Sequence, residues 1–115
     1  MLESFRVDLD ALLKNGELAW QPFRTGIEIH HLYGQIGVGR AAALLRYAPG
    51  AHLPAHRHAG FEQILVLEGA QVDDRGRYGK GTVVVNPPGS SHAVASPEGC
   101  IVFVTWDLPV EFDAE

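Results

Sequence analysis

Short runs of apolar and β-branched residues recur along most of the chain, and Gly-, Pro- and Asp-rich turns separate them. In such runs alternate side chains fall on opposite faces of an extended backbone, which predicts β-strands. The runs cover residues 25–34, 61–68, 82–86, 92–96 and 100–106. Strands at this spacing with turn signals between them predict an all-β sandwich or barrel.

Residues 40–47 need a separate interpretation, because their composition favours a helix by propensity alone. The segment is short, lies between Gly39 and Pro49, and has strands on both sides, so we predict a strand. The one helix that we predict lies near the N-terminus, at residues 8–16. Asp8 can cap it, leucines recur at helical spacing, and Asn15 and Gly16 supply a stop signal.

The length of 115 residues is typical of one domain, and the composition of 46% hydrophobic and 20% charged residues is that of an ordinary globular protein. We expect a single domain over residues 1–115, with an N-terminal appendage at 1–24, a barrel at 25–106 and a tail at 107–115. In the strand at 61–68, Glu62 and Val66 should share one face and Leu65 and Leu67 the other. Gly69 is expected to end that strand, and residues 73–81 are expected to form turns.

Charge and hydropathy exclude several classes of partner. Nine basic and fourteen acidic residues give a net charge of −5, and no basic cluster interrupts the sequence. We therefore expect neither a nucleic acid nor a membrane surface as a partner. No apolar run approaches the roughly 20 residues that span a bilayer, and the sequence Met-Leu-Glu-Ser is not a secretion signal, which favours a cytoplasmic location. The single cysteine, Cys100, cannot form an internal disulfide and is expected to be a buried small hydrophobe.

The candidate chemistry lies between residues 50 and 92. On an extended chain His56 and His58 point to the same side, and Glu62 keeps that parity. His92 follows a Gly/Pro-rich turn and reaches the others only through folding. Three imidazoles and one carboxylate suit one divalent metal ion: zinc, iron, manganese, nickel or copper. They would either close a tetrahedral site or leave two positions of an octahedron open. The alternative is that these side chains face solvent from a loop near Pro54.

Neighbouring polar and aromatic residues are expected to have other roles. Strand parity directs Arg57 away from the metal, to the surface or a salt bridge. His52 is a surface histidine or lies at the rim of the pocket. Asp73 and Asp74, in an Asp-rich turn, are interpreted as solvated caps. Trp106 is expected to pack in the core.

The spacing of the candidate ligands matches two motifs. The first, G-x5-H-x-H-x3-E-x6-G, runs from Gly50 to Gly69, and the second, G-x5-P-x-G-x2-H, runs from Gly81 to His92. These motifs resemble those of the cupin superfamily, although Ser96 stands where the second motif usually has asparagine. Residues 26–31, 40–50, 62–69 and 86–92 further resemble the cupin domain of ChrR-type anti-sigma factors and their single-domain relatives.

The resemblance implies a small cupin jelly-roll barrel, the double-stranded β-helix, with a metal held by His56, His58, Glu62 and His92. It also implies a homodimer and a small-molecule ligand or substrate. Two functional classes remain open: a dioxygenase-like metalloenzyme, and a non-catalytic metal or ligand sensor. A third alternative is a barrel that binds no metal.

A direct interaction with a sigma factor is not expected from the sequence. In ChrR-type proteins a separate N-terminal zinc-bearing domain grips the sigma factor. Before Gly26 this chain contains no histidine and no cysteine that could form such a zinc site.

Overall fold

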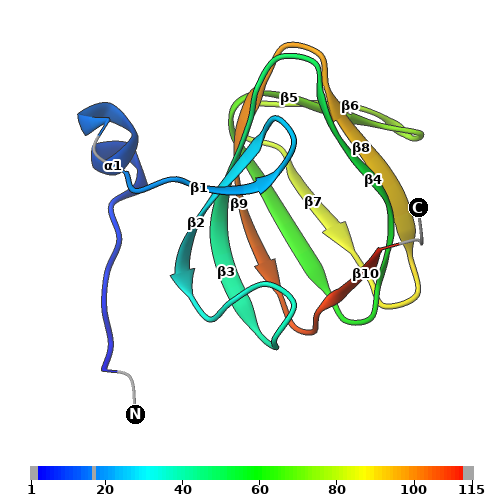
Figure 1. Ribbon diagram of the computed structural model, residues 1–115, viewed down its shortest axis with the longest axis horizontal. Helices are drawn as coiled ribbons and strands as arrows, with labels where there is room; N and C mark the ends of the chain where they lie inside the picture. The colour runs from blue at the N-terminus through cyan, green and yellow to red at the C-terminus, as the bar shows by residue number, and fades with distance from the viewer. Residues whose placement is uncertain (1–2, 17, 113–115) are drawn as a thin grey trace.

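The structure is a computed structural model that describes residues 3–16 and 18–112. Within these residues the chain forms one short helix and ten antiparallel strands, and the strands curl into a barrel (Figure 1). The all-β barrel with a short N-terminal helix is therefore confirmed. The elements in chain order are α1 (Leu9–Asn15), β1 (Gln21–Arg24), β2 (Ile27–Tyr33), β3 (Ala41–Tyr47), β4 (Ala51–His58), β5 (Glu62–Asp73), β6 (Gly76–Gly79), β7 (Val83–Asn86), β8 (Ser91–Ser96), β9 (Cys100–Trp106) and β10 (Val110–Phe112).

Helix α1 begins and ends at the predicted signals. The Asp8 carboxylate accepts a hydrogen bond from the backbone N–H of Ala11 at 3.0 Å, which satisfies one of the free donors of the first turn. Gly16 ends the helix in the left-handed conformation, with φ of 65°. None of the helical residues is buried, and the helix lies beside the barrel (Figure 1).

The segment at 40–47 is a strand, as predicted, although its composition favours a helix. Strand β3 pairs with β2 on one side and with β9 on the other, from Ala41 opposite Trp106 to Tyr47 opposite Cys100. Every residue of β3 except Arg46 is buried. Pairing on both edges and burial on both faces therefore outweigh the intrinsic preference of Ala and Leu for helix.

The barrel interior is filled by the inward-facing residues of both sheets. The predicted parity of β5 is confirmed: Glu62, Ile64 and Val66 are buried, whereas Leu65 and Leu67 on the outer face are half-buried. Alternation on β9 likewise buries Val102, Val104 and Trp106. Since these strands face the same interior, the polar Glu62 is held inside an apolar core.

Two boundary predictions for residues 69–79 are wrong. Gly69 does not end β5: residues 62–69 pair with β9, and residues 70–73 continue the strand and pair with β6. Gly69 has φ of 70°, and a side chain there would overlap the carbonyl oxygen of Gly99. The glycine therefore allows a sharp bend at which one strand passes from one sheet to the other. Residues 76–79, expected to be a turn, form β6 because β5 supplies their hydrogen-bonding partner.

The end of the described chain returns to the barrel. In β10, Val110 pairs with His58 and Phe112 with His56, so this short strand lies along the outer edge of β4 (Figure 1). The C-terminal strand thereby reaches the two histidines of the first motif. No helix among residues 3–16 and 18–112 is long and apolar enough to cross a membrane.

Candidate metal centre

The four predicted ligands come together inside the barrel, although they lie up to 36 positions apart in the sequence (92 − 56). His56 and His58 lie on β4, Glu62 begins β5, and His92 lies on β8, where it pairs directly with His56. Their potential ligand atoms all lie within 4.8 Å of one another, and all four residues are buried. The alternative in which these side chains face solvent is excluded.

Each histidine has one ring nitrogen held by the surrounding protein. The Nδ1 of His56 lies 2.9 Å from the carbonyl oxygen of Pro54, and the Nδ1 of His58 lies 3.1 Å from that of Ser90. The Nδ1 of His92 lies 3.3 Å from Oδ2 of Asp73. Because carbonyl and carboxylate oxygens only accept hydrogen bonds, they assign the proton to Nδ1. The lone pair of each Nε2 is then free for a metal.

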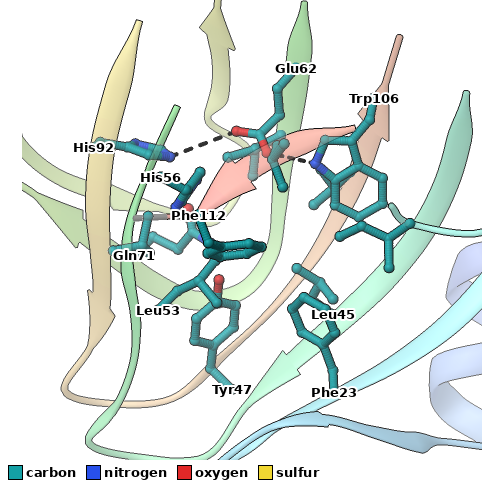
Figure 2. Close-up of a pocket in the computed structure, with 15 residues that line it drawn as sticks. Phe23, Leu45, Tyr47, Leu53, His56, Glu62, Gln71, His92, Trp106 and Phe112 are labelled. Atoms are coloured by element: carbon teal, nitrogen blue, oxygen red, sulfur yellow. Dashed lines mark hydrogen bonds and ion pairs between the residues drawn. The ribbon is translucent and has the colours of Figure 1, made fainter. Parts of the chain in front are cut away.

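The Glu62 carboxylate is fixed through both oxygens. Oε1 accepts a hydrogen bond from the side-chain amide of Asn86 at 2.9 Å. Oε2 accepts one from the indole N–H of Trp106 at 2.7 Å (Figure 2). Burial raises the pKa of Glu62, but contacts with His58 and His56 in their protonated forms, together with the hydrogen bond from Asn86, outweigh it and hold this pKa below its ordinary value. Burial lowers the pKa of His56. The site therefore favours an ionised carboxylate beside a neutral His56.

Two of the remaining imidazole nitrogens lack the partners that buried polar atoms normally have. Nε2 of His58 and Nε2 of His92 are buried and have no hydrogen-bond partner. They lie 3.0 Å and 3.8 Å from Oε1 of Glu62. With the protons on Nδ1, lone pairs face lone pairs across these distances. A second proton on His58 would relieve only one of these contacts, whereas one divalent cation would satisfy both nitrogens and the carboxylate. The residues thus fit a metal ion.

An apolar pocket adjoins the candidate ligands. Its internal volume of about 20 Å³ has room for about one water molecule. Figure 2 shows His56, His92 and Glu62 at one end of the pocket and Tyr47 and Phe23 at the other. The remaining walls are mostly aliphatic and aromatic, and include Leu45, Leu53, Trp106, Val110 and Phe112.

Sequence reasoning missed three residues that support this site. Asp73 is not a solvated cap: its side chain is 5% exposed and faces His92, whereas Asp74 is exposed as expected. Trp106 is buried as expected, but it also donates a hydrogen bond to Glu62. No role for Asn86 was predicted from the sequence. The signal that could have indicated one is a polar amide at the end of a strand of β-branched residues. The roles of Asp73, Trp106 and Asn86 each depend on which candidate ligand the side chain meets in the folded barrel.

The other two polar neighbours lie outside the site. Arg57 points outward and forms an ion pair with Glu111 at 3.6 Å, as its parity predicts. His52 is exposed and lies on the surface. Neither residue contributes to the cluster.

The curled antiparallel barrel with inward-facing histidines and a glutamate is that of a cupin. The family model described as the ChrR cupin-like domain matches residues 9–108, and the chain belongs to this family. The chain is also 34% identical over 79 residues to the anti-sigma-E factor ChrR of Cereibacter sphaeroides. That match covers 66% of this chain and 37% of the length of the relative.

Solved structures support the same fold. The complex of Rhodobacter sphaeroides SigE with the anti-sigma ChrR matches with a TM-score of 0.71 and 28% identity, over 79% of this chain and 50% of the matched chain. An acetylacetone dioxygenase from Acinetobacter johnsonii matches with a TM-score of 0.77 and 16% identity, over 100% of this chain and 80% of that one. The second likeness shows the fold alone.

Proposed function

We propose that His56, His58, Glu62 and His92 bind one divalent metal ion, and that the protein is a dioxygenase-like enzyme acting on a small organic substrate. The observation that carries this proposal is the set of buried imidazole lone pairs directed at one carboxylate beside an apolar pocket. The nitrogen and oxygen donors suit zinc, iron, manganese or nickel. Four protein ligands would leave two positions of a six-coordinate ion for substrate and oxygen.

The bound metal would supply Lewis acidity and, if it is iron, redox chemistry with oxygen. The surrounding residues prepare the site for this chemistry. Pro54, Ser90 and Asp73 hold the Nδ1 protons, so that the imidazoles need not rotate when the metal binds. Asn86 and Trp106 hold Glu62 in place.

The pocket walls suggest what kind of substrate would fit. Leu53, Phe112 and their neighbours exclude water from the side that faces the ligands. Apart from the candidate ligands, the polar residues that line the pocket are Tyr47 and Gln71. Burial strongly raises the pKa of Tyr47, so its phenol stays protonated and can donate a hydrogen bond. These walls favour a neutral, mostly apolar substrate, and because the pocket now has room for about one water molecule, such a substrate would have to displace wall side chains to enter.

Metal analysis of untagged protein tests the first part of the proposal. Wild-type protein should contain about one equivalent of metal after supplementation, and His58→Ala should lose most of it. His52→Ala is the matched control, because it makes the same change at an exposed position of the same strand. Wild-type protein without metal would contradict the proposed site.

Oxygen consumption tests the second part. The iron-loaded wild-type protein should consume oxygen with at least one member of a panel of small neutral organic compounds, and His58→Ala should not. Iron-loaded protein that consumes no oxygen with any of them would argue against the enzyme.

A non-catalytic metal or ligand sensor is the second candidate, and the similarity to the anti-sigma-E factor ChrR supports it. A sensor would bind metal without consuming oxygen. Binding assays with a purified sigma factor, using metal-loaded and metal-free protein, would test a ChrR-like interaction. Capture of the sigma factor would support a ChrR-like interaction, and no capture in either metal state would argue against it.

We also propose that the chain forms a homodimer through the outer face of the sheet that contains β5 and β7. Leu65 and Leu67 on this face are only half-buried, and Val83 and Val85 are 57% and 54% exposed. Burying these side chains against a second copy would be favourable. Sedimentation should give a dimer at micromolar concentration, and a monomer would contradict this proposal.

A further inference from the structure

Asp73 differs from the other groups that hold the histidines. The Nδ1 atoms of His56 and His58 face neutral carbonyl oxygens, whereas Nδ1 of His92 faces a carboxylate. The Asp73 side chain is 5% exposed and that of His92 is 2% exposed, so little water screens the contact between them. The two residues come from the far end of β5 and from β8, which pair at Val72, next to Asp73, and Ala95, three residues after His92.

The Asp73 carboxylate is held in a fixed orientation. Its Oδ1 accepts hydrogen bonds from the backbone N–H of Arg75 and from the phenol of Tyr78, both at 2.8 Å. Its Oδ2 is thereby directed at His92, 3.3 Å away. The β5–β6 hairpin supplies all these groups, because Asp73 and Gly76 are the pair that closes its turn.

We propose that Asp73 is a positioning residue that makes His92 a stronger metal ligand than His56 or His58, and that Tyr78 holds Asp73 in place. This inference rests on the proposed metal site. A carboxylate that accepts the Nδ1 proton fixes the imidazole ring and increases the electron density at Nε2. Neutral carbonyl oxygens fix a ring without adding a negative charge. The hairpin beyond Gly69 is therefore part of the metal centre, although it supplies no ligand.

Cobalt binding to the full chain tests the proposal. Asp73→Asn should weaken Co²⁺ affinity by about 10- to 100-fold in competition with a chelator. The visible absorption spectrum of bound Co²⁺ should also shift, because the donor strength of one ligand changes. Asp74→Asn is the matched control: it removes the same charge from the adjacent exposed residue and should leave affinity and spectrum unchanged. Tyr78→Phe should weaken binding by a smaller factor than Asp73→Asn.

The outcomes separate this inference from the proposed function. Wild-type protein that binds no Co²⁺ would overturn both. If the wild-type protein binds Co²⁺ and the folded Asp73→Asn variant binds it with the same affinity and spectrum, only the role of Asp73 is overturned. Equal effects of Asp73→Asn and Asp74→Asn would overturn that role as well. If Asp73→Asn does not fold, Tyr78→Phe decides: weaker Co²⁺ binding supports the proposal, and wild-type binding overturns it.

Discussion

The indole N–H of Trp106 donates a hydrogen bond of 2.7 Å to Oε2 of Glu62, across a sequence separation of 44 residues. Both residues are buried, and they lie opposite each other where β5 and β9 pair. The carboxylate of the candidate metal centre is thus anchored to the last long strand of the barrel.

The substitution Trp106→Phe should destabilise the protein, because it leaves Oε2 of Glu62 buried without its donor. We expect a loss of about 1–3 kcal/mol in the free energy of unfolding, measured by denaturant titration of metal-free protein. Trp20→Phe makes the same change in a tryptophan that stacks against Arg46 outside the site. It should cost less than about 1 kcal/mol, and equal losses in the two variants would contradict the importance of the Glu62 contact.

The bend at Gly69 gives a second prediction. Gly69→Ala should lower the free energy of unfolding by about 3 kcal/mol or more, because it combines a left-handed backbone with an overlap against Gly99. Gly37→Ala is the control, since Gly37 also has a positive φ, of 89°, but an added methyl group there would meet no other atom within 4 Å. It should cost only about 1–2 kcal/mol. Similar losses would show that the close approach to Gly99 is unimportant.

Phe112 closes one side of the pocket and can be tested by opening it. Its ring lies 5.3 Å from that of His56, and the Arg24 guanidinium stacks on it at 4.0 Å. Phe112→Ala should enlarge the pocket enough to admit benzene, which would raise the melting temperature of the variant above that of its benzene-free form. Glu111→Ala, which alters the neighbouring exposed side chain, should show no such shift. No benzene effect in Phe112→Ala would contradict this role.

His31 provides a pH dependence outside the site. Its Nε2 accepts a hydrogen bond from the backbone N–H of Ile36 at 3.2 Å, which requires this nitrogen to be unprotonated. Burial, followed by the charge of His30, lowers the pKa of His31. The unfolded chain therefore takes up a proton at higher pH than the folded chain does. The stabilising contribution is complete above the unfolded pKa of about 6.5 and decreases as the pH falls below it.

Substituting His31 tests this pH dependence. In the presence of a chelator, the free energy of unfolding of the wild-type protein should fall more between pH 7.5 and 5.5 than that of His31→Gln. The comparison isolates His31 because the other titratable groups are common to both proteins. If the free energies of unfolding of the two proteins change in parallel with pH, His31 is not the source of this pH dependence.

The strand pattern and the shared face of His56, His58 and Glu62 could be predicted from the sequence because they depend on local order, whereas His92 joins them only through folding. Alternation predicted the inward face of β5, and the spacing of His56 and His58 placed both imidazoles on one side of β4. The caps of α1 were also local, since Asp8 and Gly16 contact only their own helix. β3 was also predicted as a strand, because it is short, lies between Gly39 and Pro49, and has strands on both sides.

Only the tertiary structure decided which groups surround the ligands. Gly69 marks a bend in the sequence, but whether the strand stops or passes into the second sheet depends on the strands available beyond it. That passage brings Asp73 to His92, and the pairing of β5 with β9 brings Trp106 to Glu62. Local sequence fixes the face on which a side chain lies, because the backbone alternates. The residue that this side chain contacts is determined by the packing of strands distant in sequence, and no local pattern predicts that packing.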